Sequence, residues 1–394
     1  MPTEATFLLA GLFIVAAATG WAFARYSVQG RGEPPPLPVN ADYLRGLNLV
    51  LNRQTDEALE LFVRMAKVDD DTLETHFALG HLFRRRGEID RAIRVHQNLL
   101  ARPNLSETQR HQALFSLAQD YLGAGLFDRA EKLFVELRGS PTLGQAALEN
   151  LVDIYERESE WGKAIEAHRE LEMVTGEKSA QVAHYYCELA EQARFSGDLD
   201  LARQHLKSSV RSESGAFRGT LIRAAIAQEE EDFAQALRLY EQVLEADYRL
   251  MVEILPQLVA CYEATNRQQE LQRYLESFIA RDGEAKRSLA YAVIINNLTS
   301  PAVLCDCVED FILQHDVMAT FIDTDHLSEL PQADREQAVL RITRGLRQLA
   351  LSSARYRCTN CGYSTQRLVW HCPSCKAWET IKPIQAFQFE RLVA

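Results

Sequence analysis

The chain has 394 residues, which is enough for two or more domains or for one extended array of repeats. Hydrophobic residues make up 47% of it and charged residues 25%, the usual proportions of a globular protein. Its net charge of −12 at pH 7 argues against a general nucleic-acid-binding protein, because such proteins need a basic surface to bind phosphates.

The first candidate element is an uncharged run over residues 5–24, ATFLLAGLFIVAAATGWAFA. A helix of this length and composition is long enough to cross a bilayer. A cleaved signal peptide is the alternative, but such peptides begin with a basic segment, and Glu4 is the only charged side chain before the run. We therefore predict a transmembrane anchor over residues 1–26.

Two basic residues, Arg25 and Arg31, follow the apolar run, and none precedes it. Because positively charged residues are enriched on the cytoplasmic side of membranes, this asymmetry predicts that the rest of the chain faces the cytoplasm. The next segment, GRGEPPPLP, favours an extended and fairly stiff backbone. We predict that residues 27–39 are a proline-rich juxtamembrane linker.

Internal repetition dominates residues 40–282. Each unit has a small residue, a second residue three positions later that is often aromatic, a third twelve positions after the first that is usually alanine, and a bulky residue four positions further on. The small residues let two helices approach, the bulky ones fill the space between them, and neighbouring pairs cover each other's apolar faces. This spacing resembles the tetratricopeptide repeat, and about seven units fit it: Gly46, Leu49, Ala58 and Phe62; Gly80, Phe83, Ala92 and His96; Ala118, Tyr121, Ala130 and Phe134; Val152, Tyr155, Ala164 and His168; Ala190, Ala193, Ala202 and Leu206; Ala224, Ala227, Ala236 and Tyr240; and, more weakly, Val259, Tyr262, Leu271 and Leu275.

Residues 283–354 keep the helical periodicity but lose the repeat motif. We predict two divergent helix pairs here, ending in an amphipathic helix within QADREQAVLRITRGLRQLALSSA. Four cysteines fall within helical patterns and are expected to be small core residues: Cys187, Cys261, Cys305 and Cys307.

A tetratricopeptide array curls into a superhelix, and the first helix of each pair lines its concave groove. The register of the repeats places eight side chains on this groove: Phe77, His81, Arg84, Phe115, Gln119, Glu149, Asp153 and Glu156. We interpret them as a candidate surface for a peptide or protein partner, and a plain solvated face is the alternative. Such arrays are binding scaffolds far more often than enzymes.

The strongest motif is RCTNCGYSTQRLVWHCPSC, residues 357–375. Its two Cys-x-x-Cys steps form turns, called knuckles here, that let four thiolates chelate one metal ion: Cys358, Cys361, Cys372 and Cys375. Gly362 follows the first step and can adopt the positive φ that such a turn often needs. Four thiolates fit zinc or a single iron in a closed structural site, and their spacing favours a metal site over disulfides.

We predict a metal-binding domain over residues 355–394. A module of this size is too small to fold on its apolar core alone, so the metal must contribute much of its stability. Its aromatic residues are expected to dock it on the last helices, where it would cap the array: Tyr356, Trp370, Trp378 and Phe387. His371 is surplus to the four thiolates and is expected beside the site or at the surface.

The sequence contains no glycine-rich phosphate loop, Gly-x-Ser-x-Gly or His-Glu-x-x-His motif, so a non-enzymatic protein is the favoured interpretation. Two alternatives concern the cysteine module. One is an electron carrier. The other is a nucleic-acid-binding zinc ribbon, which five cations favour slightly: Arg355, Arg357, Arg367, Lys376 and Lys382.

The order of features is specific: a predicted span, a proline-rich spacer, a repeat array, and the knuckles YRCTNCGY and CPSC, which resemble those of rubredoxins and short zinc ribbons. Over essentially the whole chain this order resembles the lipopolysaccharide assembly protein B family. The resemblance implies an all-α tetratricopeptide-repeat solenoid with an N-terminal transmembrane helix and a C-terminal rubredoxin-like module. The short segment between the knuckles departs from true rubredoxins, which leaves iron and zinc both open as the bound ion.

The resemblance also implies a function. Members of the family sit in the bacterial inner membrane and face the cytoplasm. They act as adaptors that promote degradation of the lipid A pathway deacetylase LpxC by the membrane protease FtsH, and an inner-membrane lipopolysaccharide sensor protein (YejM/PbgA-like) blocks that action. A scaffold that gathers lipopolysaccharide synthesis and transport proteins, with no role in proteolysis, is the alternative. Neither reading involves nucleic acid, and a homo-oligomer stays open.

Overall fold

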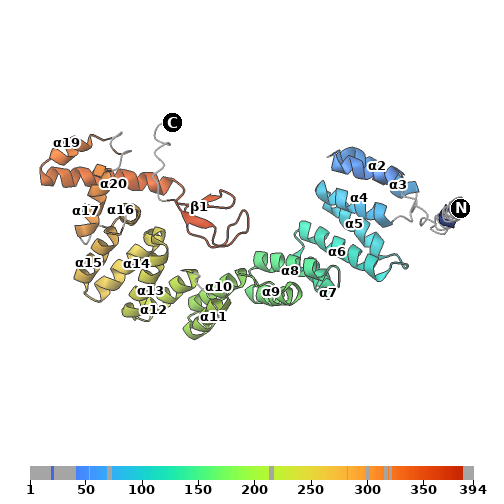
Figure 1. Cartoon of the computed structure of the whole chain (residues 1–394), viewed down its shortest axis with the longest axis horizontal. Coiled ribbons are helices and arrows are strands. Elements are labelled where there is room, and N and C mark those ends of the chain that lie inside the picture. The colour runs from blue at the N-terminus through green and yellow to red at the C-terminus, as the bar shows by residue number, and fades with distance from the viewer. Residues whose placement is uncertain are drawn as a thin grey trace, which may run out of the picture. The chain divides into compact units, whose positions relative to one another are not determined.

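The computed structural model describes residues 19–21, 41–52, 54–68, 73–212, 217–281, 283–298, 302–314, 318 and 322–384. These residues are mostly helical, with one small sheet near the C-terminus (Figure 1), which confirms the helical class predicted from the sequence. They fall into two compact units, divided between Ile154 and Tyr155.

Apart from residues 19–21, the predicted anchor (1–26) and linker (27–39) lie outside the described residues. Within the part of the chain that the structure describes, no helix is both long enough and apolar enough to cross a bilayer.

Helices of the first unit follow one another with short connections. They are α2 (Ala41–Leu51), α3 (Thr55–Val68), α4 (Leu73–Arg85), α5 (Ile89–Leu100), α6 (Glu107–Gly123), α7 (Phe127–Leu137) and most of α8 (Gly144–Glu158). The second unit continues with α9 (Trp161–Thr175), α10 (Gln181–Phe195), α11 (Leu199–Ser212), α12 (Phe217–Glu229), α13 (Phe233–Ala246), the 3-10 helix η1 (Tyr248–Leu250), α14 (Met251–Ala264) and α15 (Gln268–Ile279).

The end of the second unit departs from this regular alternation. It holds α16 (Gly283–Asn296), α17 (Ala302–Gln314), the short α19 (Thr324–Glu329) and the long α20 (Gln332–Ser352), which leads into strands β1 (Tyr356–Cys358), β2 (Ser364–Thr365) and β3 (Ile381–Pro383). The strands form an antiparallel sheet in the order β2-β1-β3, in which Tyr356 pairs with both Thr365 and Pro383.

Contacts between small and bulky residues hold each helix pair together, as the repeat motif predicts. A Cβ atom added to Gly46 would lie 2.5 Å from the Phe62 ring, and one added to Gly80 would lie 2.4 Å from the His96 ring. No side chain fits at such distances unless the ring moves, so these two positions require glycine. The motif alanines on the second helices are fully buried: Ala58, Ala92, Ala130, Ala164, Ala202 and Ala236.

The turn between the two helices of a pair is the same in six pairs. The residue just before the second helix donates its backbone N–H to the carbonyl of the motif residue five positions earlier, over 2.8–2.9 Å: Glu88 to Phe83, Leu126 to Tyr121, Glu160 to Tyr155, Asp198 to Ala193, Asp232 to Ala227, and Arg267 to Tyr262. The residue before each donor has a positive φ, which turns the backbone so that this helix-ending bond can form: Gly87, Gly125, Ser159, Gly197, Glu231 and Asn266.

One apolar core runs from α12 to the C-terminal sheet. It joins Leu255 and Leu258 of α14 and Leu289 of α16 with Tyr356 and Ile381 of the strands. The small module therefore shares a core with the helices before it, which compensates for its own size.

Three of the four cysteines outside the knuckles are buried, as predicted: Cys187, Cys261 and Cys307. Cys305 is exposed, contrary to the prediction, because residues two positions apart on a helix point to opposite sides and Cys307 faces the core.

Candidate metal centre and partner surfaces

The four cysteines of the two knuckles converge on one point. Their sulfur atoms all lie within 4.8 Å of one another, and the Sγ atoms of Cys358 and Cys375, like those of Cys361 and Cys372, are 3.7 Å apart. Sulfurs at the corners of a tetrahedron, each about 2.3 Å from a central zinc ion, would be about 3.8 Å apart. The residues present therefore fit one metal ion, which would link the two knuckles and leave no position for water.

Each knuckle is closed by the same backbone bond. Gly362 donates its N–H to the Cys358 carbonyl over 3.0 Å, and Lys376 donates to the Cys372 carbonyl over 2.9 Å. Both residues have positive φ, 77° and 59°. The sequence predicted this for Gly362 but not for Lys376, because lysine gives no signal of a left-handed backbone.

Local hydrogen bonds favour the thiolate form of two of the four cysteines. The Thr380 hydroxyl lies 3.2 Å from Sγ of Cys358 and lowers the pKa of that thiol to about 6. The Ala377 backbone N–H lowers the pKa of Cys375, whereas burial raises the pKa of Cys372 to about 11. Metal binding needs deprotonated thiols, so these hydrogen bonds favour the metal-binding form of Cys358 and Cys375.

A tryptophan holds the module against the helices of the second unit. The Trp378 indole is stacked between two imidazoles, His371 of the module at 4.5 Å and His184 of α10 at 5.0 Å between ring centroids. Its Nε1 donates a hydrogen bond to the Glu156 carboxylate over 3.0 Å, and Trp161 meets its ring edge-on.

Further polar contacts hold the residues around Trp378 and Glu156 in place. The buried Tyr185 hydroxyl donates to the same oxygen of Glu156 over 2.7 Å and lies 3.1 Å from His168 Nε2. Burial, and then the neighbouring Arg218 and His371, lower the pKa of His184 to about 4. His184 is therefore neutral near pH 7 and stacks on Trp378 without bringing a second cation beside Arg218.

Arg218 of α12 is a buried cation at this contact between the module and the helices. Its guanidinium is almost fully buried, pairs with Glu188 at 2.8 Å and with Glu191, and lies about 6 Å from the Trp370 and Trp378 rings. A cation over an aromatic face is attracted by the ring quadrupole, more strongly when water is excluded.

The expected docking of the module is therefore correct for one aromatic residue and wrong for another. Tyr356 donates its hydroxyl to Glu253 of α14, within the core that includes α16 and α20, and burial raises the pKa of Glu253. Trp378 instead contacts Glu156 of α8 and His184 of α10, far earlier than the last helices. Phe387 lies outside the described residues.

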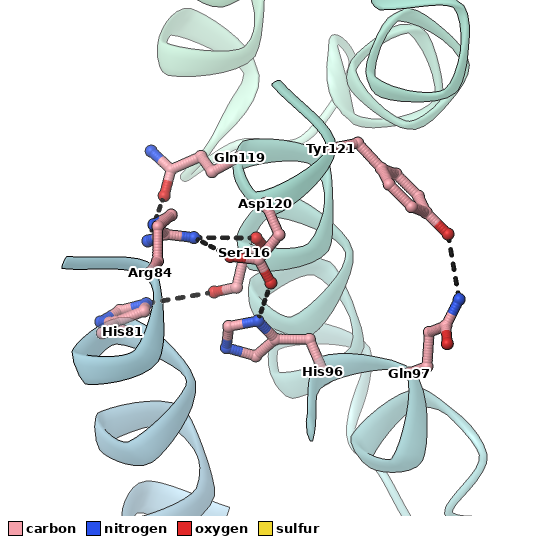
Figure 2. A network of polar contacts seen from close by, with 8 residues as sticks. All are labelled: His81, Arg84, His96, Gln97, Ser116, Gln119, Asp120 and Tyr121. Carbon is pink, nitrogen blue, oxygen red and sulfur yellow. Dashed lines mark hydrogen bonds and ion pairs between the residues drawn. The ribbon is translucent and has the colours of Figure 1, made fainter. Parts of the chain in front are cut away.

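Three of the predicted groove residues, His81, Arg84 and Gln119, belong to a polar network in the first unit (Figure 2). Arg84 pairs with the buried Asp120 at 2.7 Å and donates to the Gln119 side chain and to the Ser116 carbonyl. His81 Nε2 lies 3.4 Å from the Ser116 hydroxyl, and burial followed by the charge of Arg84 lowers the pKa of His81 to about 4. His81, Arg84 and Gln119 thus hold α4 against α6 as well as facing outward.

The other predicted groove residues differ in exposure. Phe77 is half-buried near His96, Phe115 is buried edge-on against Phe134, Asp153 is half-buried, and Glu149 is exposed and accepts a bond from Gln145. Glu156 is engaged by Trp378 in the second unit. Of these, Glu149 offers the most open polar side chain, and the groove as a partner surface stays a proposal.

Comparison with known proteins gives the family. Residues 356–383 match the rubredoxin metal binding domain, and residues 75–108 and 115–177 match the tetratricopeptide repeat. The Lipopolysaccharide assembly protein B of Escherichia coli strain K12 is 35% identical over 381 residues, which cover 96% of this chain and 98% of that protein. The chain belongs to the lipopolysaccharide assembly protein B family.

A protein of the same name from Haemophilus influenzae is 31% identical and covers the same shares of both chains, 96% and 98%. Among solved structures, Naa15/Naa10 bound to HypK-THB matches 80% of this chain and 47% of that chain, with a TM-score of 0.50 at 18% identity. That likeness supports the repeat fold alone. The family relationship predicted from the order of features is confirmed.

For this family member we expect Trp378→Ala to release the module from α8 and α10 while the four cysteines keep their metal. Truncating a buried tryptophan typically costs about 3–5 kcal/mol, and here the stacking on His184 and the bond to Glu156 are lost together. Hydrogen exchange of α10 amides should accelerate, and metal content should stay unchanged.

Tyr363→Ala is the matched control, because the Tyr363 side chain is exposed in the same module and its backbone carbonyl is retained. Unchanged exchange in α10 for Trp378→Ala would show that the tryptophan does not hold the module.

Proposed function

We propose that this chain is a non-enzymatic, inner-membrane adaptor that limits lipopolysaccharide synthesis by promoting degradation of the deacetylase LpxC by the protease FtsH. The carrying observation is its relationship, along 96% of its length, to proteins named Lipopolysaccharide assembly protein B. An N-terminal anchor over residues 1–26, with the remainder in the cytoplasm, is part of the proposal. It would confine the adaptor to the membrane plane of its protease and raise their effective concentration.

The described residues support a binding role in two ways. Helix pairs of the tetratricopeptide type present long surfaces made from successive helices. The four-cysteine centre is closed by four protein thiolates, which suits a structural ion rather than one that activates water. The ion, iron or zinc, would hold the two knuckles in place. Trp378 would then keep the module in contact with α8 and α10.

The test is the half-life of the deacetylase in cells that contain or lack this protein. We expect depletion to lengthen the half-life several-fold, and re-expression of the wild type to restore it. A variant with the segment 1–26 replaced by an unrelated transmembrane helix separates anchoring from specific contacts within the membrane. An unchanged half-life on depletion would refute the adaptor role.

A second candidate is a scaffold that assembles lipopolysaccharide synthesis or transport proteins without proteolysis. The relatives are named Lipopolysaccharide assembly protein B, and the role in assembly that this name states favours the scaffold. It predicts an unchanged deacetylase half-life together with defective envelope assembly on depletion, so one experiment separates the two. A sensor protein of the YejM/PbgA type would be a partner only under the adaptor proposal.

A further inference from the structure

A hollow of about 470 Å³ lies between α11 and α13 in the second unit, and we call it the α11–α13 hollow. Its floor is apolar: Leu206 of α11 and Ile226 and Ala227 of α12 line it and are only 2–3% exposed. Val210 of α11 stands at its side and is 52% exposed, unusually open for a valine. The hollow can therefore receive an apolar side chain that reaches below the surrounding surface.

Three cations line the same hollow: Arg203, Lys207 and Arg223. Lys207 of α11 and Arg223 of α12 are exposed, and neither forms an ion pair with any residue that the structure describes. One carboxylate, Glu230, also lines it, so the residues around the hollow carry a formal charge of +2, three cations against one carboxylate, in a chain whose net charge is −12. The hollow is thus a locally basic, partly apolar site on an acidic protein.

The third cation, Arg203, has a different role. It pairs with Glu230, in the turn before α13, and with Asp200 at 3.1 Å. Arg203 and Glu230 also line the neighbouring hollow over the α10–α11 turn, so their ion pair is shared by the two hollows. Among the described residues, Lys207 and Arg223 have no carboxylate partner of this kind.

We propose that the α11–α13 hollow binds an acidic amphipathic segment of a partner protein. An apolar side chain of the segment would insert against Leu206 and Ile226 beside Val210, and carboxylates one helical turn away would pair with Lys207 and Arg223. A groove between two helices with an apolar floor suits a helix that presents one apolar face. The charges of Lys207 and Arg223, at the rim of the hollow, would speed the association of acidic partners and select them.

A lipid surface fits the same site less well. Two free cations near an anionic membrane contribute only about 1 kcal/mol each. The apolar floor is recessed, so a flat surface resting on the rim would leave Leu206 and Ile226 uncovered. A protruding side chain of a protein reaches them.

The probe is a fluorescein-labelled helical peptide of about 15 residues, a length at which an isolated helix is marginally stable. It carries two leucines one turn apart, with glutamates flanking them. We expect the full chain to bind it, and Lys207→Glu with Arg223→Glu to weaken binding at least about tenfold, since each reversed rim charge replaces attraction by repulsion. Fluorescence anisotropy at two salt concentrations measures the affinity, which should fall as salt rises.

Arg238→Glu is the matched control, because Arg238 is an exposed cation of α13 outside the hollow, and its reversal should leave binding unchanged. The same peptide with lysine in place of glutamate should not bind. Equal affinity for the two peptides, or equal affinity in the double variant, would overturn the proposal. Displacement of the peptide by monomeric dihexanoyl-phosphatidylglycerol, with lipid binding lost in the double variant, would assign the hollow to lipid and overturn it as well.

Discussion

Replacing Cys358 and Cys361 together with serine is expected to remove the bound metal ion and to unfold residues 356–383. Serine is a poor ligand for zinc or iron, and the second knuckle alone offers two thiolates where a structural site needs four. Binding free energies of structural zinc are about 10–16 kcal/mol in small zinc-finger peptides, more than a module of this size gains from its own core. Elemental analysis should find one ion per wild-type chain and almost none in the variant.

The loss should spread beyond the knuckles. Trp378 and His371 are positioned by the second knuckle, and their stack on His184 ends when that knuckle unfolds. We therefore expect faster hydrogen exchange in α10 as well as in β1–β3, and loss of the proposed adaptor function. Cys305→Ser is the control, because Cys305 is exposed on α17 outside the site. A double variant that retains one ion per chain would contradict the assignment of the ligands.

Sequence reasoning succeeded where the determining contacts are local. The Cys-x-x-Cys steps place their sulfurs through a single turn each, so the spacing alone predicts the site. The contacts of Gly46 with Phe62 and of Gly80 with His96 join two consecutive helices, so a fixed spacing reveals them. The turn positions are less regular in sequence, since serine, glutamate and asparagine occupy the left-handed position in three pairs at a modest cost in strain.

Sequence reasoning failed where contacts join distant parts of the chain. Trp378 and Glu156 are 222 residues apart, and nothing in the local pattern of either predicts their bond. The repeat motif does contain one signal of such a contact. The bulky position of the motif is a histidine in two repeats, His96 and His168, and a polar ring at a buried position needs a partner. The structure supplies those partners as Asp120 and Tyr185.

Asp120→Ala is expected to destabilise the first unit by about 3–5 kcal/mol, the usual cost of removing one member of a buried ion pair. The Asp120 side chain is fully buried and binds Arg84 of α4 at 2.7 Å and His96 of α5, so one carboxylate joins three helices (Figure 2). Without it, Arg84 keeps only neutral acceptors. His96, whose Nε2 already lacks a partner among the described residues, would lose its remaining bond.

Hydrogen exchange resolved along the chain is the suitable measurement, because repeat arrays often do not unfold in one step. Protection should fall in α4, α5 and α6 and stay unchanged in α14 and α16 of the second unit. Asp120→Asn keeps the shape of the side chain and one hydrogen-bond acceptor, so it should reduce the protection of α4, α5 and α6 by less than Asp120→Ala does. Asp128→Ala, at an exposed site in the first turn of α7, should cost less than about 1 kcal/mol. Equal protection in α4–α6 for Asp120→Ala and Asp128→Ala would mean that helix packing, and not the buried carboxylate, fixes the register of these three helices.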